Sequence, residues 1–324
     1  MINEQFLNQA LKFYDFKHPH AELLRHSENM TYKITDAEKK YMLRIHKSIE
    51  GFSYDFLNKG YSRIEMVQAE LEIISSLKNG TNLPIQMPVY GINGDLVQTF
   101  SDNTPVTLLE WVEGQTLENI IMTPKILIKS GKLMAEIHSF FYKKTELNKL
   151  YKRYNFDQSI LPKIAERIEN AMRIRAITEK QADIIIKSLY EIQRRLDELD
   201  NMQEKHIVHA DLGKSNVIMG VDGHLAPIDF GLCGYSHFYM DIAGIYGLNH
   251  VDGDSKSMIE EYKRVRKCEI NPRYIEAYFA FIIILFLSSQ YEMAKEWEWF
   301  PNKMDWWCRD IFKPLVNKTN FIFI

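Results

Sequence analysis

The chain has 324 residues, of which 46% are apolar and 26% are charged, so it is long enough to bury one large core or two medium ones. Forty basic and 43 acidic side chains give a formal net charge of −3, which argues against nucleic acid as a partner. Three widely spaced cysteines without a C-x-x-C pair argue against a disulfide framework or a structural zinc site, and favour a reducing compartment.

No stretch of the sequence has the pattern of a targeting signal or a membrane span. The first 16 residues lack a basic segment followed by an apolar run. The most apolar run, 277–287, is shorter than the roughly 20 residues that cross a bilayer, and Glu276 and Glu292 bracket it. We therefore expect a buried core helix there, no membrane partner and a cytoplasmic location.

The N-terminal part of the chain predicts a helix followed by a small antiparallel sheet. Residues 1–18 place five apolar side chains on one helical face: Phe6, Leu7, Ala10, Leu11 and Tyr14. Three short β-like runs follow, joined by polar turns, at 22–26, 30–35 and 41–46. Adjacent antiparallel strands are the expected arrangement.

A second helix, expected at residues 62–78, carries a carboxylate on its apolar face. When Val67 is placed at the centre of that face on a helical wheel, Glu70 lies on the same side. A buried charge without a partner is costly, so Glu70 needs a cation, and Arg44 in the third β-like run is the nearest candidate. A plain salt bridge in the core is the alternative interpretation of this pair.

Further strands are expected at 88–90, 96–100 and 107–112. The pattern then becomes helical, with amphipathic helices expected at 123–143, 162–172 and 178–199. His138, on the apolar stripe of the first of these helices, is expected to be a core histidine with a satisfied hydrogen bond rather than a metal ligand. A β-rich lobe of residues 1–112 is therefore predicted to precede a helical lobe of residues 113–324.

The stretch 206–231 combines residue types that suit metal-bound phosphate chemistry. It predicts strand, loop, strand, turn and strand, and Asp222-Gly223 indicates a two-residue hairpin turn. Such a turn pairs positions whose numbers sum to 445, so Asn216 is expected opposite Asp229. Asp211 enters this hairpin on the preceding loop. A surface hairpin with turn-prone residues is the alternative, and the joint spacing H-x-D-x-x-x-x-N with I-D-F-G argues against it.

These oxygen-bearing side chains predict a site for phosphoryl transfer. An amide oxygen and a carboxylate suit Mg²⁺, which prefers one or two carboxylates together with phosphate oxygens and water. A further carboxylate could accept the proton of an attacking hydroxyl group. Phosphoryl transfer needs little else from a protein than a metal, positioned phosphates and an oriented nucleophile.

Three motifs carry a family resemblance: His209 to Asn216 (HADLGKSN), Ile228 to Gly231 (IDFG) and Asp241 to Ala243 (DIA). Through them the sequence resembles the protein-kinase superfamily, and more narrowly the group of aminoglycoside phosphotransferases, choline kinases and homoserine kinases. The resemblance covers most of the chain. It implies an α+β, bilobal, protein-kinase-like fold with a small antiparallel sheet in the N-lobe and a mainly helical C-lobe.

The resemblance also implies roles for individual residues of the C-lobe. Asp211 would be the catalytic base, and Asn216 and Asp229 would be the Mg²⁺ ligands. His209 would support the catalytic loop, and Asp241 would brace that loop from the next helix. Ala210, between them, stands where many relatives carry glycine.

In the N-lobe, the resemblance implies that ATP is bound by the sheet and the hinge. Arg44 would contact the phosphates, in place of the lysine of relatives, with Glu70 as its ion-pair partner. The backbone of Glu110, Trp111 and Val112 would offer hydrogen bonds to the adenine.

The turn at residues 27–29 would lie over the phosphates. It contains no glycine, unlike the Gly-rich loop of protein kinases. Backbone amides and the side chains of Ser27 and Asn29 are therefore the groups expected to cap the phosphates.

The acceptor is expected to be a hydroxyl group of a small molecule. Only eleven residues separate Asp229 from Asp241, and no A-P-E motif follows, which leaves little room for a peptide-docking platform. The C-terminal region interleaves Trp and Tyr with acidic residues, a combination that could hold an amine or a quaternary ammonium group. Helix packing with a solvated acidic face is the alternative, and the sequence leaves both open.

The sequence therefore predicts an ATP- and Mg²⁺-dependent phosphotransferase that acts on an aminoglycoside, an amino alcohol or a related metabolite. The absence of glycine from the 27–29 turn motivates a second hypothesis, a catalytically silent kinase-like module that only binds nucleotide. A serine/threonine protein kinase is a third hypothesis, which the short segment after Asp229 disfavours.

Overall fold

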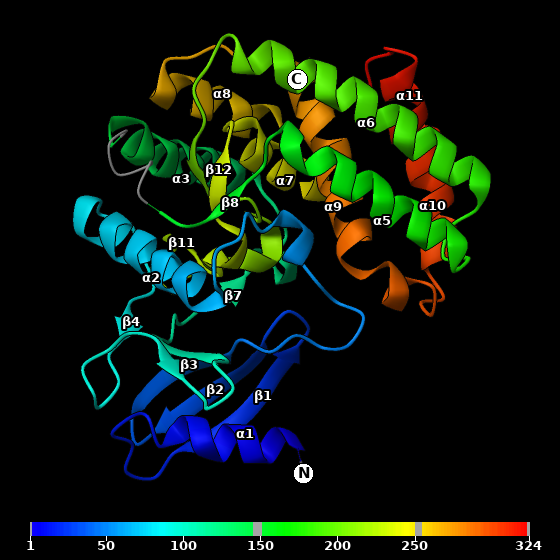
Figure 1. Ribbon diagram of the computed structural model, residues 1–324. Coiled ribbons are helices and arrows are strands. Elements are labelled where there is room, and N and C mark those ends of the chain that lie inside the picture. Colours follow the sequence, from blue (N-terminus) through cyan, green and yellow to red (C-terminus); the bar gives the residue numbers. More distant parts are fainter. Residues whose placement is uncertain (1, 145–150, 250–254, 323–324) are drawn as a thin grey trace.

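The computed structural model describes residues 2–144, 151–249 and 255–322, which form two lobes (Figure 1). The smaller lobe is built on a six-stranded antiparallel sheet with the strand order β1-β2-β3-β6-β4, in which β5 also pairs with β6. The strands are β1 His20–His26, β2 Met30–Asp36, β3 Lys39–Ile45, β4 Pro88–Val89, β5 Gln98–Thr99 and β6 Pro105–Glu110.

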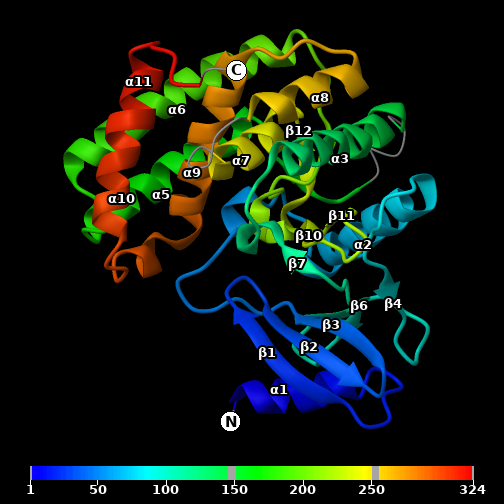
Figure 2. The same cartoon turned by 180° about the vertical axis from the view of Figure 1, so that it is seen from behind.

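Helix α1, Ile2–Leu11, covers the outer face of this sheet (Figures 1 and 2). Ala10 is fully buried there, in an apolar cluster shared with the sheet. The helix ends at Leu11 and is shorter than the apolar pattern predicts. Farther along the chain, the backbone N–H groups of Lys17 and His18 donate to the carboxylate of Asp36. These bonds hold the chain after α1 against the turn between β2 and β3.

Helix α2, Arg63–Gly80, packs on the other side of the sheet and faces the large lobe. A capping box starts it: Ser62 Oγ accepts from the Glu65 N–H, and the Glu65 carboxylate accepts from the Ser62 N–H. The buried side chains of α2 belong to one continuous core that extends through the large lobe. The apolar core therefore crosses residue 112, and the division into lobes of residues 1–112 and 113–324 stays a prediction.

The large lobe is mainly helical, and its long helices follow the periodicity of the sequence. Thr123, Thr178 and Asn271 cap α3, α6 and α9 with their side chains. The helices are α3 Pro124–Lys143, α5 Leu161–Arg173, α6 Glu179–Asp200, α7 Tyr239–Asn249, α8 Lys256–Arg266, α9 Pro272–Ala294, α10 Phe300–Trp307 and α11 Lys313–Val316. Two three-stranded sheets lie beside them, made of β7 Gln115–Thr116, β10 Val217–Met219 and β11 Leu225–Pro227, and of β8 Tyr154–Asn155, β9 His206–Val208 and β12 Gly234–Ser236.

Helix α9 runs through the middle of this lobe and contacts α5, α6 and α7 (Figure 1). By length and composition alone it could cross a membrane, but 72% of its most apolar stretch is buried inside the protein. Tyr278 and Phe281 within it have no exposed surface. The run 277–287 is therefore part of the lobe's core, as its length predicts.

The hairpin of β10 and β11 is shifted by one residue from the expected register. Its paired positions, such as Met219 and Leu225, sum to 444 rather than 445. The turn contains three residues instead of two, because Gly223 closes it with a φ of +75°. The expectation that Asn216 lies opposite Asp229 is therefore wrong: Asn216 accepts a backbone hydrogen bond of 2.9 Å from the residue before Asp229.

Candidate active site

One buried carboxylate holds the loop that carries Asp211. Asp241, in the first turn of α7, accepts hydrogen bonds from the backbone N–H groups of His209 and Ala210 at 2.9 and 2.7 Å, and lies 2.8 Å from His138 Nε2. Burial alone would raise the pKa of Asp241, but the hydrogen bonds from His138 and from the backbone N–H of His209 hold it below its ordinary value. Asp241 thus braces the loop as expected, and His138 is a core histidine with a satisfied hydrogen bond, also as expected.

His209 and Ala210 set the backbone conformation of the loop. The ring of His209 is buried, with Nε2 2.9 Å from the carbonyl oxygen of Ile228 and Nδ1 3.4 Å from the backbone nitrogen of Asp211. Burial lowers the pKa of His209, and a neutral ring that donates through Nε2 satisfies both contacts. Ala210 has a φ of +66°, a conformation that glycine adopts freely and that costs an alanine about 1 kcal/mol.

Asp211 faces the cleft between the lobes, and Asn216 holds its carboxylate. Nδ2 of Asn216 donates to Oδ2 and to the backbone carbonyl oxygen of Asp211, at 2.8 and 2.9 Å. Loss of hydration, and then repulsion by Asp229, raise the pKa of Asp211 to about 7. Water in the cleft still reaches this side chain and moderates the rise. A carboxylate held in this way is suited to accept a proton near neutral pH.

Asp229 lies among cationic side chains of the small lobe. Its Oδ2 is 2.9 Å from an Nη of Arg25, and its Oδ1 is 3.3 Å from an Nη of Arg44. Arg44 in turn pairs with Glu70 at 2.6 Å, and both of these side chains are only 2% exposed. Burial opposes ionisation of Asp229, but Arg44 and Arg25 hold its pKa below the ordinary value. The structure therefore joins Arg44 to Glu70 as the helical wheel predicts, and their contact with a nucleotide stays a prediction.

Arg25 was not apparent as a site residue from the sequence. It lies on β1, where a bulge between Leu23 and Arg25 shifts the pairing with β2. Such a bulge re-aims a side chain, here toward Asp229 of the other lobe. The sequence of β1, HAELLRH, carries no motif that marks a bulge, so the sequence did not indicate a role for Arg25.

The side chains of Asn216 and Asp229 suit a hard divalent cation with few protein ligands. A carboxylate oxygen and an amide oxygen are ligands that Mg²⁺ accepts. Among the described residues, no group of three His, Cys, Asp or Glu side chains lies close enough to hold a metal. A cation bound here would therefore take its other ligands from phosphate oxygens and water, which is the coordination that Mg²⁺ prefers.

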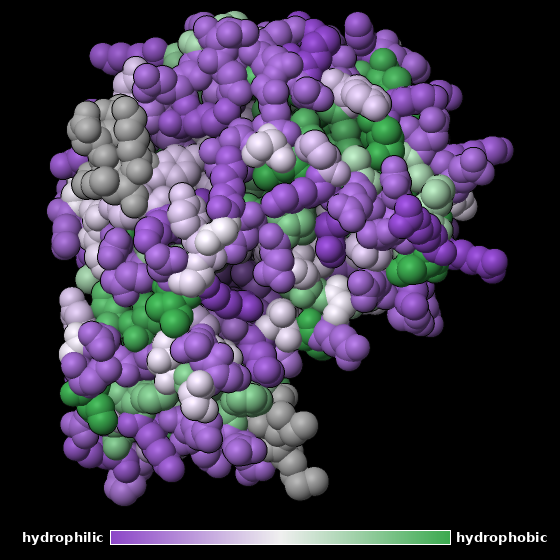
Figure 3. Space-filling view, viewed as in Figure 1, coloured by the Kyte–Doolittle hydropathy of each residue, from purple (hydrophilic) through white to green (hydrophobic). Residues whose placement is uncertain are grey.

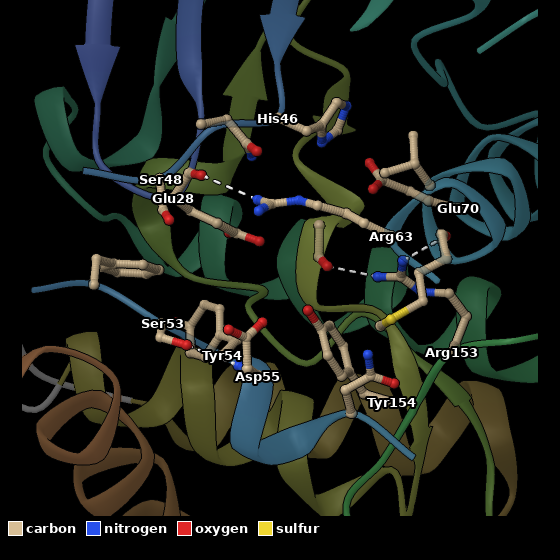
Figure 4. A pocket seen from close by; sticks show the side chains of 16 residues that line it. Glu28, His46, Ser48, Ser53, Tyr54, Asp55, Arg63, Glu70, Arg153 and Tyr154 are labelled. Atoms are coloured by element: carbon tan, nitrogen blue, oxygen red, sulfur yellow. Dashed lines mark hydrogen bonds between the residues drawn. The ribbon is translucent and has the colours of Figure 1, made fainter. Parts of the chain in front are cut away.

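The β1–β2 turn bends inward toward the cleft. Asn29 is only 6% exposed and lines a cavity of about 90 Å³ between the lobes, whereas Ser27 is half-buried and does not line that cavity. Glu28, which the sequence did not single out, points into the same cavity (Figure 4). Burial, followed by the charges of Asp229 and Glu70, raises the pKa of Glu28 to about 7. The turn thus brings a carboxyl group, in addition to its amides, to the place where the phosphates are expected.

Arg153 fixes the segment that follows Asp229. Its buried guanidinium donates to the carbonyl oxygens of Met66 on α2 and Gly231, at 2.8 and 2.5 Å (Figure 4). It also donates to the carbonyl oxygen of Cys233 at 2.9 Å. These bonds tie α2 to the segment after Asp229. A single arginine in an irregular stretch carries no motif, so the sequence did not indicate this role.

The expected hinge, residues 110–112, makes backbone hydrogen bonds to other parts of the small lobe. The N–H of Glu110 donates to the carbonyl of Met87 at 2.8 Å, and the N–H of Trp111 donates to that of Lys40 at 3.1 Å. These two donors therefore do not face an adenine. The carbonyl oxygen of Glu110 accepts a hydrogen bond from Nε2 of Gln86 at 2.7 Å, so it too is used within the protein. The carbonyl of Trp111 and the backbone of Val112 remain the predicted contacts.

A cavity of about 730 Å³ opens on Asp211 from the helical lobe. Ala210, Asp211 and Gly213 form one wall, and residues of α7, α9 and the C-terminal region form the others. Its size is that of a typical small-molecule site. Trp299, Trp306 and Trp307 of the aromatic C-terminal region line this cavity, so a hydroxyl group in it could reach Asp211. Contact of this region with a substrate stays a prediction.

Comparison with known families identifies most of the chain. The model of the phosphotransferase enzyme family matches residues 20–278, a span that includes Asp211, Asn216, Asp229 and Asp241. No curated protein sequence matches the chain.

Solved structures resemble the fold over nearly the whole chain. An amicoumacin kinase in complex with AMP-PNP and Ca²⁺ has a TM-score of 0.74 at 16% identity, with 99% of this chain and 95% of that chain covered. A microcompartment-associated aminopropanol kinase has a TM-score of 0.73 at 19% identity, with coverages of 97% and 98%. A spectinomycin phosphotransferase in complex with ADP and spectinomycin has a TM-score of 0.62 at 14% identity, with coverages of 97% and 96%. These similarities confirm the bilobal, protein-kinase-like fold.

Proposed function

Because the chain belongs to the phosphotransferase enzyme family, we propose that it transfers the γ-phosphoryl group of ATP to a hydroxyl group of a small molecule, with Mg²⁺ as the metal. One observation carries the proposal. Asp211 lies between a cavity of about 730 Å³ and the charged cluster around Asp229, so one carboxylate borders both candidate substrate sites.

The site residues have different roles in an in-line displacement at the γ-phosphorus atom of ATP. Asp211, oriented by Asn216, accepts the proton of the acceptor hydroxyl as that oxygen attacks the γ-phosphorus atom. The bond between the γ-phosphorus and the bridging oxygen breaks, so ADP leaves with the electron pair and the phosphate ester forms. Arg44 and Arg25 place two positive charges beside Asp229, where phosphate oxygens would gather.

Asn216 and Asp229 are the side chains that would hold Mg²⁺, which when bound neutralises phosphate charge. The presence of AMP-PNP and Ca²⁺ in the amicoumacin kinase and of ADP in the spectinomycin phosphotransferase supports a nucleotide and a divalent cation in this fold. The choice of ATP and Mg²⁺ for this chain rests on the family and on the oxygen ligands.

A small acceptor fits better than a protein. The eleven residues between Asp229 and Asp241 include β12, which pairs with β9 and β8 inside the lobe. A segment held in a sheet offers no docking platform for a peptide. The cavity beside Asp211, by contrast, is lined by residues of α7, α9 and α10 together with the loop that carries Asp211.

The test compares wild type with Asp211→Asn in two assays. Consumption of ATP across a panel of hydroxyl compounds should fall about 10²- to 10⁴-fold in the variant, because the base is lost. Stabilisation by ATP and Mg²⁺ in a thermal-shift assay should persist in both proteins. Equal turnover in the variant and the wild type would show that Asp211 is not the catalytic base. A wild type that ATP stabilises but that never consumes ATP would favour the catalytically silent module that only binds nucleotide.

A further inference from the structure

The cavity beside Asp211 has an apolar wall made by one helix. Phe279, Ile282, Ile283 and Phe286 follow the spacing i, i+3, i+4, i+7 along α9 and all line it. The opposite face of α9 is buried in the core of the lobe. This explains why α9 is apolar all round: one face packs, and the other forms the cavity.

Aromatic rings of the C-terminal region complete this wall. Phe286 meets Trp307 edge-on at 6.0 Å between ring centroids, and Trp299 stacks on Trp297 at 5.2 Å. The stacked partner fixes the plane of Trp299, yet 49% of Trp299 is exposed. A large ring that is held rigid and left half-exposed beside a cavity offers a flat surface to another ring.

The charges of the wall do not suit a cationic acceptor. The acidic residues of the C-terminal region are exposed and do not line the cavity: Glu292, Glu296, Glu298 and Asp305. Among the described residues, Asp211 is the one carboxylate in the lining, and its proposed task is the hydroxyl proton.

Lys303 supplies a positive charge instead. Its ammonium group lies over the ring of Trp306, 4.2 Å from the centroid, and both residues line the cavity. A face of Trp306 that could attract a cationic ligand is therefore already occupied by the protein's own cation. A second cation would meet repulsion there, whereas a neutral or anionic group would not.

We infer that the acceptor is an alcohol with a flat, aromatic body and without a cationic group. This inference rests on the proposed function, because it takes the cavity as the acceptor site. Stacking on Trp299 and contact with Phe286 would hold the body, Asp211 would face the hydroxyl group, and Lys303 would tolerate or pair with a carboxylate at the rim.

Three probes with one body test this. We would use 2-naphthylmethanol and its analogues with a carboxylate or an aminomethyl group at position 6, with ATP and Mg²⁺. The neutral and carboxylate probes should give kcat/KM values at least ten-fold above that of the amine. Lys303→Glu should reverse the order of the carboxylate and the amine, and Lys313→Glu, an exposed lysine outside the cavity, should leave it unchanged.

Binding separates this inference from the proposed function. Quenching of tryptophan fluorescence in Asp211→Asn should report the same order of affinities without turnover, and Trp299→Ala should weaken all three at least ten-fold. Binding in the expected order with no phosphorylation in wild type would count against the proposed function, and would keep only the preference of the cavity for a flat ligand without a cationic group. Preference for the amine, no binding of any probe, or an order that Lys303→Glu does not change would overturn the inference.

Discussion

Arg25 on β1 donates a hydrogen bond of 2.9 Å to Oδ2 of Asp229 across the cleft. Arg44 reaches the other carboxylate oxygen at 3.3 Å, so both oxygens of the candidate metal ligand face guanidinium groups. The two arginines differ in setting, because the Arg25 side chain is 57% exposed and that of Arg44 is 2% exposed. Arg25 is thus free to move from Asp229 to a phosphate, while Arg44 is fixed by Glu70.

Arg25→Ala should weaken nucleotide use without harming the fold. We expect the KM for ATP to rise about ten-fold, since a charge-assisted hydrogen bond to phosphate contributes roughly 1.5 to 3 kcal/mol. Stability should change by less than about 1 kcal/mol, because an exposed ion pair contributes little. Steady-state kinetics and urea unfolding measure the two effects. Lys39→Ala, an exposed cation of the same sheet, is the control, and an equal KM for both variants would count against the phosphate role.

Asp229→Ala and Asp211→Asn should fail in different ways. Loss of Asp229 should abolish turnover and also remove the dependence of ATP affinity on Mg²⁺, because a metal ligand is gone. Asp211→Asn should keep that dependence. Titration of ATP at several Mg²⁺ concentrations by calorimetry distinguishes them, and a metal-dependent affinity that survives Asp229→Ala would show that the ligand lies elsewhere.

The sequence predicted the helices, the strands and the residue types of the site more accurately than it predicted which side chains of the site touch one another. Periodicity located α2 and with it the Arg44–Glu70 pair, because a carboxylate on an apolar face demands a partner. The register of the β10–β11 hairpin was missed, since Asp-Gly fits both a two-residue turn and a three-residue turn. Arg25 and Arg153 act through a bulge and an irregular segment, which depend on tertiary packing and leave no local pattern.

Arg44→Lys should show why an arginine stands at this position. One guanidinium spans Glu70 at 2.6 Å and Asp229 at 3.3 Å, and a lysine ammonium on a similar stem cannot hold both in the same geometry. We expect a folded variant with kcat/KM for ATP reduced about ten-fold or more, and stability reduced by about 1 to 3 kcal/mol. Kinetics with circular dichroism as a fold check would test this. Wild-type kinetics in Arg44→Lys would mean that a point charge suffices.

Ala210→Gly should stabilise the protein. Ala210 has a φ of +66°, so glycine relieves a left-handed strain of about 1 kcal/mol, partly offset by the greater freedom of glycine when unfolded. We expect a net gain of up to about 0.5 kcal/mol in the free energy of unfolding. Ala165→Gly, in the middle of helix α5, is the matched control and should lose about 1 kcal/mol. A loss in both variants would show that the strain at Ala210 is not costly.

Asp241→Asn should cost stability in a way that depends on pH. The buried carboxylate of Asp241 accepts from two backbone N–H groups and contacts His138, and an amide would turn a donor toward one of them. We expect a loss of about 3 kcal/mol at pH 7. The folded-state pKa of Asp241 is below its ordinary value, so this stabilisation is present above about pH 4 and is lost as the pH falls through the folded-state pKa. Urea unfolding of both proteins at pH 7, 5 and 3 should therefore show a difference that shrinks toward pH 3. Asp183→Asn on the exposed face of α6 should show little difference at any pH, and a constant gap for Asp241→Asn would mean that its charge does not brace the loop.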